Sequence, residues 1–178
     1  MFSVTRESVP DDSLLRTYRG SVMPEQWGAY ADCFAVKTAG EVALREFVFA
    51  FYTSRVFRLE GLILRILLGV SAGRSDALAL ADGASDKFAA WYVGQRTATQ
   101  LLMCDRYERT RSWFCAAPDP DGGTRLLFGS AVAAKRDKTG SPSLGRRFNF
   151  LLRFHLVYSQ VLLRAAERNL PAPGRPRR

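Results

Sequence analysis

The spacing of hydrophobic residues divides the chain into segments with different expected structures. Residues 1–27 show no sustained period and are interrupted by Pro10, Gly20 and Pro24. Proline and glycine at such positions are typical of a segment without regular secondary structure. We therefore expect an amino-terminal arm, with a short helix over 12–18 as its only regular element.

A strand and a helix are predicted after the arm. Residues 30–38 are compatible with a strand in which Phe34 and Val36 share one face. Thr38 and Glu41 then have the spacing of a capping box, and an apolar run of helical period follows directly. The pattern predicts that the first long helix begins at Thr38.

Two more helices are predicted before the period changes. Residues 53–54 (Thr-Ser) indicate a break and a second cap before an apolar helix over 56–68. A third, short helix over 76–82 has Ser75 as its expected cap and Gly83 as its expected end.

After Gly83 the hydrophobic period is two residues, which is the period of a strand. Four strands are predicted, over 87–96, 99–107, 109–117 and 124–135. The short links between them require antiparallel pairing. A long helix over 144–169 ends before Pro171. The order predicts an α+β fold with helices segregated to one side of an antiparallel sheet.

Composition agrees with one well-cored domain, because the chain has 178 residues of which 47% are hydrophobic. The formal net charge is +9, and three of the charges are Arg175, Arg177 and Arg178 at the end of the chain. The rest of the chain has a moderate basic excess that comes from Arg. This excess permits anionic ligands, and a general bias toward Arg explains it equally well.

The residues that carry most enzyme and metal chemistry are sparse in this sequence. Cys33, Cys104 and Cys115 are odd in number and unclustered, and His155 is the only histidine, so neither a disulfide framework nor a metal site is indicated. Phosphate-binding and dinucleotide-binding fingerprints are missing as well. We assign no catalytic residue, metal or cofactor. Without a signal peptide or an apolar run of membrane-spanning length, a cytoplasmic location is expected.

The order of elements, and segments such as FYTSRVFRLEGLILRILLG, FAAWYVGQR, RTRSWF and LLFGSAV, resemble an uncharacterised bacterial domain-of-unknown-function family. That family belongs to the START/birch-allergen-like (SRPBCC, helix-grip) superfamily. The resemblance implies a curved antiparallel sheet wrapped around the long carboxy-terminal helix, with two or three short helices after the first strand. It implies a single START-like domain over 28–170, between the arm of residues 1–27 and a disordered basic tail over 171–178.

A cavity between the sheet and the last helix is the site where such a fold holds a ligand. Arginine beside indole rings suits an anionic amphiphile, since guanidinium grips a carboxylate while the rings cover an apolar body. His155 and Ser159 are one helical turn apart and offer hydrogen bonds. The candidate ligand-binding residues are Trp91, Arg96, Arg111, Trp113, His155 and Ser159. The alternatives are an outward arginine stacked on a surface tryptophan, and a histidine packed within an apolar helix.

The leading hypothesis is binding of a small hydrophobic or anionic amphipathic molecule, and enzymatic activity is not indicated. The main alternative is a dimeric interaction protein, because both faces of the strand over 99–104 are apolar and an uncovered face would favour a homodimer. Nucleic-acid binding is less favoured, since the basic residues are dispersed along the chain. The position of the aromatic and basic side chains in the fold distinguishes these hypotheses.

Overall fold

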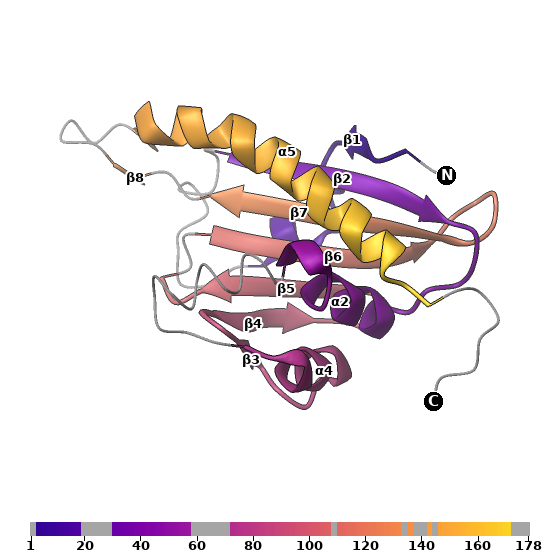
Figure 1. Ribbon diagram of the computed structural model, residues 1–178. Coiled ribbons are helices and arrows are strands. Elements are labelled where there is room, and N and C mark those ends of the chain that lie inside the picture. The colour runs from indigo at the N-terminus through magenta and orange to yellow at the C-terminus, as the bar shows by residue number, and fades with distance from the viewer. Residues whose placement is uncertain are drawn as a thin grey trace.

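The computed structural model is an α+β protein built on one antiparallel sheet (Figure 1). The part of the chain that it describes comprises residues 3–18, 30–57, 72–107, 110–132, 135–136, 142–143 and 146–171. Most of the predicted helix over 56–68 and the predicted tail from residue 172 onward lie outside the described residues.

Seven strands form the sheet in the order β1-β2-β7-β6-β5-β4-β3, with every neighbouring pair antiparallel. They are β1 (Thr5–Glu7), β2 (Tyr30–Thr38), β3 (Lys87–Phe88), β4 (Trp91–Arg96), β5 (Gln100–Asp105), β6 (Thr110–Pro118) and β7 (Thr124–Val132). A separate pair is formed by β8 (Lys135–Arg136) and β9 (Pro142–Ser143). The helices are α1 (Leu14–Thr17), α2 (Leu44–Tyr52), α4 (Arg74–Asp82) and α5 (Arg146–Arg168). The predicted α+β class with an antiparallel sheet is confirmed, but the helices are not all on one side, because α1 packs on the opposite face from the others.

Two strands differ from the pattern-based prediction. The arm contains β1, whose Thr5 pairs with Ala35, so the strand predicted to be first is the second. The predicted strand over 87–96 is a hairpin in which Phe88 pairs with Trp91, and Ala89 has a positive φ of 52°. Alternation cannot reveal such a turn when alanine replaces the usual glycine or asparagine.

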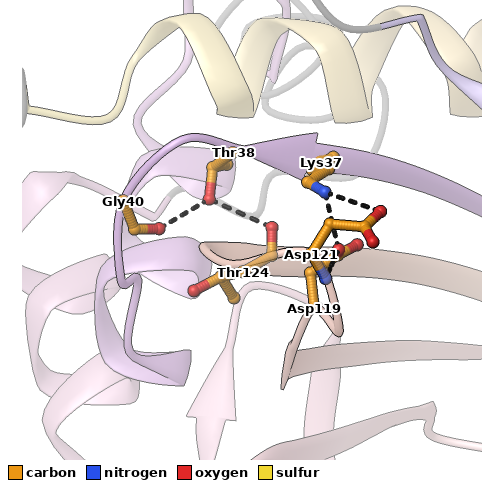
Figure 2. A network of polar contacts seen from close by, with 6 residues as sticks. All are labelled: Lys37, Thr38, Gly40, Asp119, Asp121 and Thr124. Carbon is orange, nitrogen blue, oxygen red and sulfur yellow. Dashed lines mark hydrogen bonds and ion pairs between the residues drawn. The ribbon is translucent and has the colours of Figure 1, made fainter.

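The first long helix begins at Leu44, so the capping box predicted at Thr38 is wrong. The Thr38 hydroxyl instead donates to the carbonyl oxygens of Gly40 and Thr124, over 2.9 and 3.0 Å (Figure 2). The helix is capped five residues later, where the Glu46 carboxylate accepts from the backbone amide of Ala43 over 3.1 Å. Strand β2 continues as far as Thr38, so the Thr38 hydroxyl bonds to β7 and does not cap the helix.

The same corner contains an ion-pair cluster that ties β2 to the β6–β7 loop. Lys37 Nζ lies 2.7 Å from Asp119 Oδ1 and 3.2 Å from Asp121 Oδ2 (Figure 2). Gly123 has φ +84°, and a Cβ there would collide with the carbonyl oxygen of Thr38. The loop therefore packs directly on the end of β2. Since the Thr124 hydroxyl also accepts from the amide of Val42 over 2.8 Å, this corner sets where α2 starts.

The other predicted helix ends are confirmed in part. Ser54 accepts a hydrogen bond from the amide of Phe57 over 3.2 Å, as the predicted second cap requires. Gly83 ends α4 in the left-handed conformation, with φ 74°. The start of α4 differs, because Gly73 occupies the capping position and its amide donates to Asp76 Oδ2 over 2.7 Å. Ser75 is thus within the helix.

The sheet has two covered faces, and the helices are divided between them. We call the side under α2, α4 and α5 the helix face (Figure 1). Its buried apolar strand residues are Phe34, Val36, Phe88, Leu101, Met103, Phe114, Ala116, Leu126 and Phe128. The opposite side is the arm face, where α1 and Val9 pack on Cys33, Ala35, Leu102, Cys104, Trp113, Cys115, Leu127 and Ala131. Alternation along each strand separates the two sets.

Helix α5 runs diagonally over β2 and β7 and is anchored at its end (Figure 1). Leu162, Leu163 and Ala166 are buried against the helix face. After the helix, the side-chain amide of Asn169 donates to the carbonyl oxygen of Ala50 over 2.9 Å and to the Thr53 hydroxyl over 3.0 Å. The end of α5 is therefore fixed to the end of α2. Among the described helices, none is long and apolar enough to span a membrane.

Candidate functional site

A cavity of about 250 Å³ lies on the helix face, where α2, α5 and the sheet meet. Trp91 of β4 closes it on one side. Its walls are formed by Phe51, Tyr52, Phe57, Trp91, Thr110, Arg111, Ser112, Phe114, Phe128, Ser130, Ala131, Val132, Tyr158, Ser159 and Leu162. Most of these side chains are apolar or aromatic, which is typical of a site for a small organic ligand.

The apolar part of the wall is an aromatic cluster centred on Phe51. Its ring centroid lies 4.8 Å from those of both Phe114 and Phe128. Tyr52 continues the cluster, with its ring 4.8 Å from Phe57. The Phe51–Phe114 and Tyr52–Phe57 contacts are edge-to-face, and the Phe51–Phe128 contact is tilted by 37°. Such contacts hold large rings at fixed angles, so they resist collapse into the space beside them.

A row of polar residues crosses three strands, and two of its three members belong to the cavity wall. Asp32 of β2 pairs with Ser130 of β7, which pairs with Ser112 of β6. Directly paired residues point to the same side of a sheet, so all three belong to the helix face. Ser112 and Ser130 line the cavity, and Asp32 lies next to Ser130, away from the cavity wall.

The carboxylate of Asp32 is buried and collects three hydrogen bonds. Ser130 donates to Oδ1 from its hydroxyl over 2.7 Å and from its amide over 3.1 Å. Tyr30 donates to Oδ2 over 2.6 Å. Burial raises the pKa of Tyr30 and the hydrogen bond to Asp32 raises it further, so the phenol keeps its proton. Three convergent donors are the bonding pattern of an ionised carboxylate.

Ser159 of α5 adds a hydroxyl to the cavity wall, opposite the sheet. Its side chain is 1% exposed. Its Oγ has no hydrogen-bond partner within the described part of the chain. Serine in a helix usually bonds to a backbone carbonyl or to water. This hydroxyl therefore remains available to a molecule in the cavity.

Three of the six sequence-predicted site residues line the cavity, namely Trp91, Arg111 and Ser159. Trp91 forms part of its wall from β4, and Ser159 faces it from α5. His155 lies one turn before Ser159 in α5, and its side chain is outside the described part of the structure.

Arg111 and Trp113 have their functional groups on the other face of the sheet. The indole of Trp113 is 1% exposed among the arm-face residues and donates from Nε1 to Gln100 Oε1 over 2.7 Å. Arg111 adjoins the cavity by position, but its guanidinium carbon lies 4.7 Å from the ring centroid of Tyr18 on the arm face. Arg111 and Trp113 alternate onto the arm face, whereas Trp91 packs on the helix face.

Arg96 has a structural position at the end of β4. Its guanidinium donates to the carbonyl oxygens of Leu80 and Ala81, which are at the carboxy-terminal end of α4. Burial lowers the pKa of Arg96. A cation at this end of a helix satisfies orphan carbonyls and complements the helix dipole. Within the described residues, Arg96 is not part of the cavity wall.

Sequence reasoning missed the polar row, although the pattern contained a signal for it. In the strand YADCFAVKT, Tyr30 and Asp32 alternate in phase with Phe34 and Val36. An acidic residue at a core-facing position of an apolar strand predicts a buried, hydrogen-bonded carboxylate.

The described residues contain no group of three or more His, Cys, Asp or Glu side chains that could hold a metal ion. In comparisons with known proteins, no family model, no curated protein and no solved structure matches the chain. The site is therefore interpreted from its own geometry.

Proposed function

We propose that this protein binds a small, mostly apolar molecule in the cavity between its sheet and its carboxy-terminal helix. The observation that carries the proposal is the cavity itself, an aromatic-walled space of about 250 Å³ with a buried hydroxyl on its α5 side. Well-packed interiors leave few voids larger than a water molecule. A space of this size beside large aromatic rings is better explained by a ligand than by imperfect packing.

The volume limits the ligand. Sites for drug-sized molecules usually measure about 300–1,000 Å³, and a dry apolar cavity of about 150 Å³ is enough to bind benzene. The cavity lies between these values. One ring or two fused rings, with few substituents, match the available space.

The helix-grip architecture of the START/birch-allergen-like superfamily is part of the same proposal. Seven antiparallel strands in one sheet and a long helix crossing β2 and β7 support it. So does the position of the cavity between that helix and the strands. Fold analogy does not define a function. The proposal therefore rests on the cavity, and the architecture is only consistent with it.

The two alternatives receive less support from the described residues. The dimer hypothesis was drawn from the apolar second face of the strand over 99–104, and there Leu102 and Cys104 are buried within the single chain by the arm. Base stacking on tryptophan needs exposed rings. Trp113 is buried and Trp91 faces the cavity, so neither ring is presented as a surface platform.

A ligand-observed NMR titration with naphthalene tests the proposal. Wild-type protein is expected to bind it, and Ser159→Phe, which fills the cavity, is expected to weaken binding more than about 10-fold. Val157→Phe is the matched control, because it adds the same ring at an exposed position of α5. Circular dichroism establishes that both variants are folded. Failure of folded wild type to bind, or equal binding by both variants, would overturn the proposal.

A further inference from the structure

The hydroxyl of Ser159 gives the cavity a polar preference. A buried hydroxyl without a partner is costly, and a ligand atom that bonds to it recovers that cost. Ser13 is the other described serine with a buried Oγ that lacks a partner, and it stands before α1 on the arm face without a side-chain cap bond. Only Ser159 of these two lines the cavity. The hydroxyl can both donate and accept, so a ligand hydroxyl satisfies it in either direction.

The charges around the cavity disfavour an anion. A buried acid, Asp32, lies beside the lining residue Ser130 and accepts its hydrogen bonds. The guanidinium of Arg111 lies over Tyr18 on the opposite face of the sheet. Within the described lining, no other residue is basic. A carboxylate ligand would thus be desolvated close to a like charge.

A cationic ligand is disfavoured for a different reason. The carboxylate of Asp32 already accepts from Ser130 and Tyr30, and it is not part of the cavity wall. An ammonium group in the cavity would lose its water without direct contact with the acid, which is costly.

We infer that the ligand is an uncharged molecule with an aromatic or alicyclic body and a single hydroxyl group that bonds to Ser159. This inference rests on the proposed function and names the class of ligand. It replaces the anionic amphiphile expected from Arg111 by a neutral alcohol or phenol, because the guanidinium and the cavity are on different faces.

Four probes with one ring system separate the possibilities at pH 7, where 2-naphthol is neutral. They are naphthalene, 2-naphthol, 2-naphthoate and 2-(aminomethyl)naphthalene, which is cationic. We expect 2-naphthol to bind about 3- to 10-fold more tightly than naphthalene, as one net hydrogen bond allows. Both charged probes should bind at least about 50-fold more weakly than 2-naphthol.

Two serine variants identify the partner of the hydroxyl. Ser159→Ala is expected to remove the advantage of 2-naphthol, so that this variant binds 2-naphthol and naphthalene within about 2-fold of each other. Ser13→Ala deletes the same group at a buried position on the arm face, and it should leave the ratio unchanged.

The outcomes also distinguish this inference from the proposed function. If naphthalene binds but 2-naphthol has no advantage, or if a charged probe binds most tightly, the inference is wrong and the cavity remains a ligand site. The same holds if Ser159→Ala keeps the full advantage. If none of the four probes binds to the folded protein, both the inference and the proposed function are wrong.

Discussion

The two faces of the sheet are covered in different ways, and only one of them leaves a cavity. On the arm face, a single helical turn and a few neighbouring residues close tightly over Trp113 and the three cysteines. On the helix face, longer helices and aromatic rings pack against the strands and leave about 250 Å³ between α2, α5 and the sheet. One face thus provides stability, and the other combines stability with a site.

Glycine explains how the arm packs so closely. A Cβ on Gly129 would lie 3.1 Å from the Trp113 ring and 3.2 Å from Leu15 of α1. A Cβ on Gly94, at the irregularity in β4, would lie 2.7 Å from the sulfur of Cys104. Without side chains at these positions, the arm and the indole occupy the space directly above the strands. The described strand residues of the helix face include no such glycine, and their side chains meet the rings of α2 directly.

Arg111 fastens the arm to its face. Its guanidinium stacks on the ring of Tyr18 and donates to the carbonyl oxygen of that residue over 3.3 Å. The side chain is 2% exposed. An arginine that sequence analysis assigned to a ligand therefore contributes to the closure of the opposite face.

The largest expected effect is on the arm face. Trp113→Ala should lower the free energy of unfolding by about 3–5 kcal/mol, because it empties a fully packed site and leaves Gln100 without its indole partner. Urea denaturation measures the change. Naphthalene affinity should stay within about 2-fold, since the indole is remote from the cavity. A stability loss below about 1 kcal/mol, or a loss of binding in the folded variant, would contradict the contrast between the faces.

A smaller effect is expected next to the cavity. Leu162→Ala should cost about 2–3 kcal/mol, near the low end for a buried leucine, because this side chain already borders empty space on one side. The same change enlarges the cavity, so a three-ring hydrocarbon such as anthracene should gain affinity relative to naphthalene. Urea denaturation and NMR titration give the two values. A cost equal to that of Trp113→Ala, with no change in ligand preference, would argue for a uniformly packed interior.

The smallest effect on stability is expected from Ser112→Cys, a variant whose thiol reports how easily a reagent reaches the cavity. The native cysteines report the same for the arm face. Burial raises the pKa of Cys33 to about 12 and that of Cys115 to about 11, so both thiols hold their protons at pH 8. The native cysteines should therefore react with Ellman's reagent about 100-fold or more slowly than a free thiol. Ser112→Cys places a thiol in the cavity wall, and it should react faster than the native three without a measurable shift in Tm.

Naphthalene should slow the reaction of Ser112→Cys and leave the native cysteines unaffected. Rapid reaction of the wild-type protein would mean that the arm opens readily. Equal rates for wild type and variant would mean that the cavity is closed to the reagent.

Local patterns predicted the strands and the final helix with useful accuracy. The predicted range 30–38 is that of β2, and 144–169 differs from α5 by a few residues at its ends. Period, caps and turn residues are local properties, so they can be read without knowing the fold. The errors at Thr38 and Ser75 show that a suitable capping residue does not reveal which groups form the cap. The Thr38 hydroxyl bonds to Thr124, and the cap of α4 is formed by Gly73 and Asp76.

The candidate site was predicted less completely. Trp91 and Ser159 were found, whereas the row containing Asp32 and Ser130 was missed. Alternation correctly placed Arg111 and Trp113 on one face of β6 but could not say which covering layer lay over that face. The sequence does not show which residues cover that face, because Tyr18 and Arg111 are far apart in the chain. They meet only when the arm folds back over the sheet.

The sequence by itself therefore determined the elements, the antiparallel pairing and the sorting of side chains into two faces, because periods of two and 3.6 residues follow from backbone geometry. The tertiary structure decided which face received the arm, which received the long helices, and where space remained between them. Those outcomes depend on how side chains from distant segments fill one volume. Local sequence fixes where each side chain points along its strand, and only packing determines what it meets there.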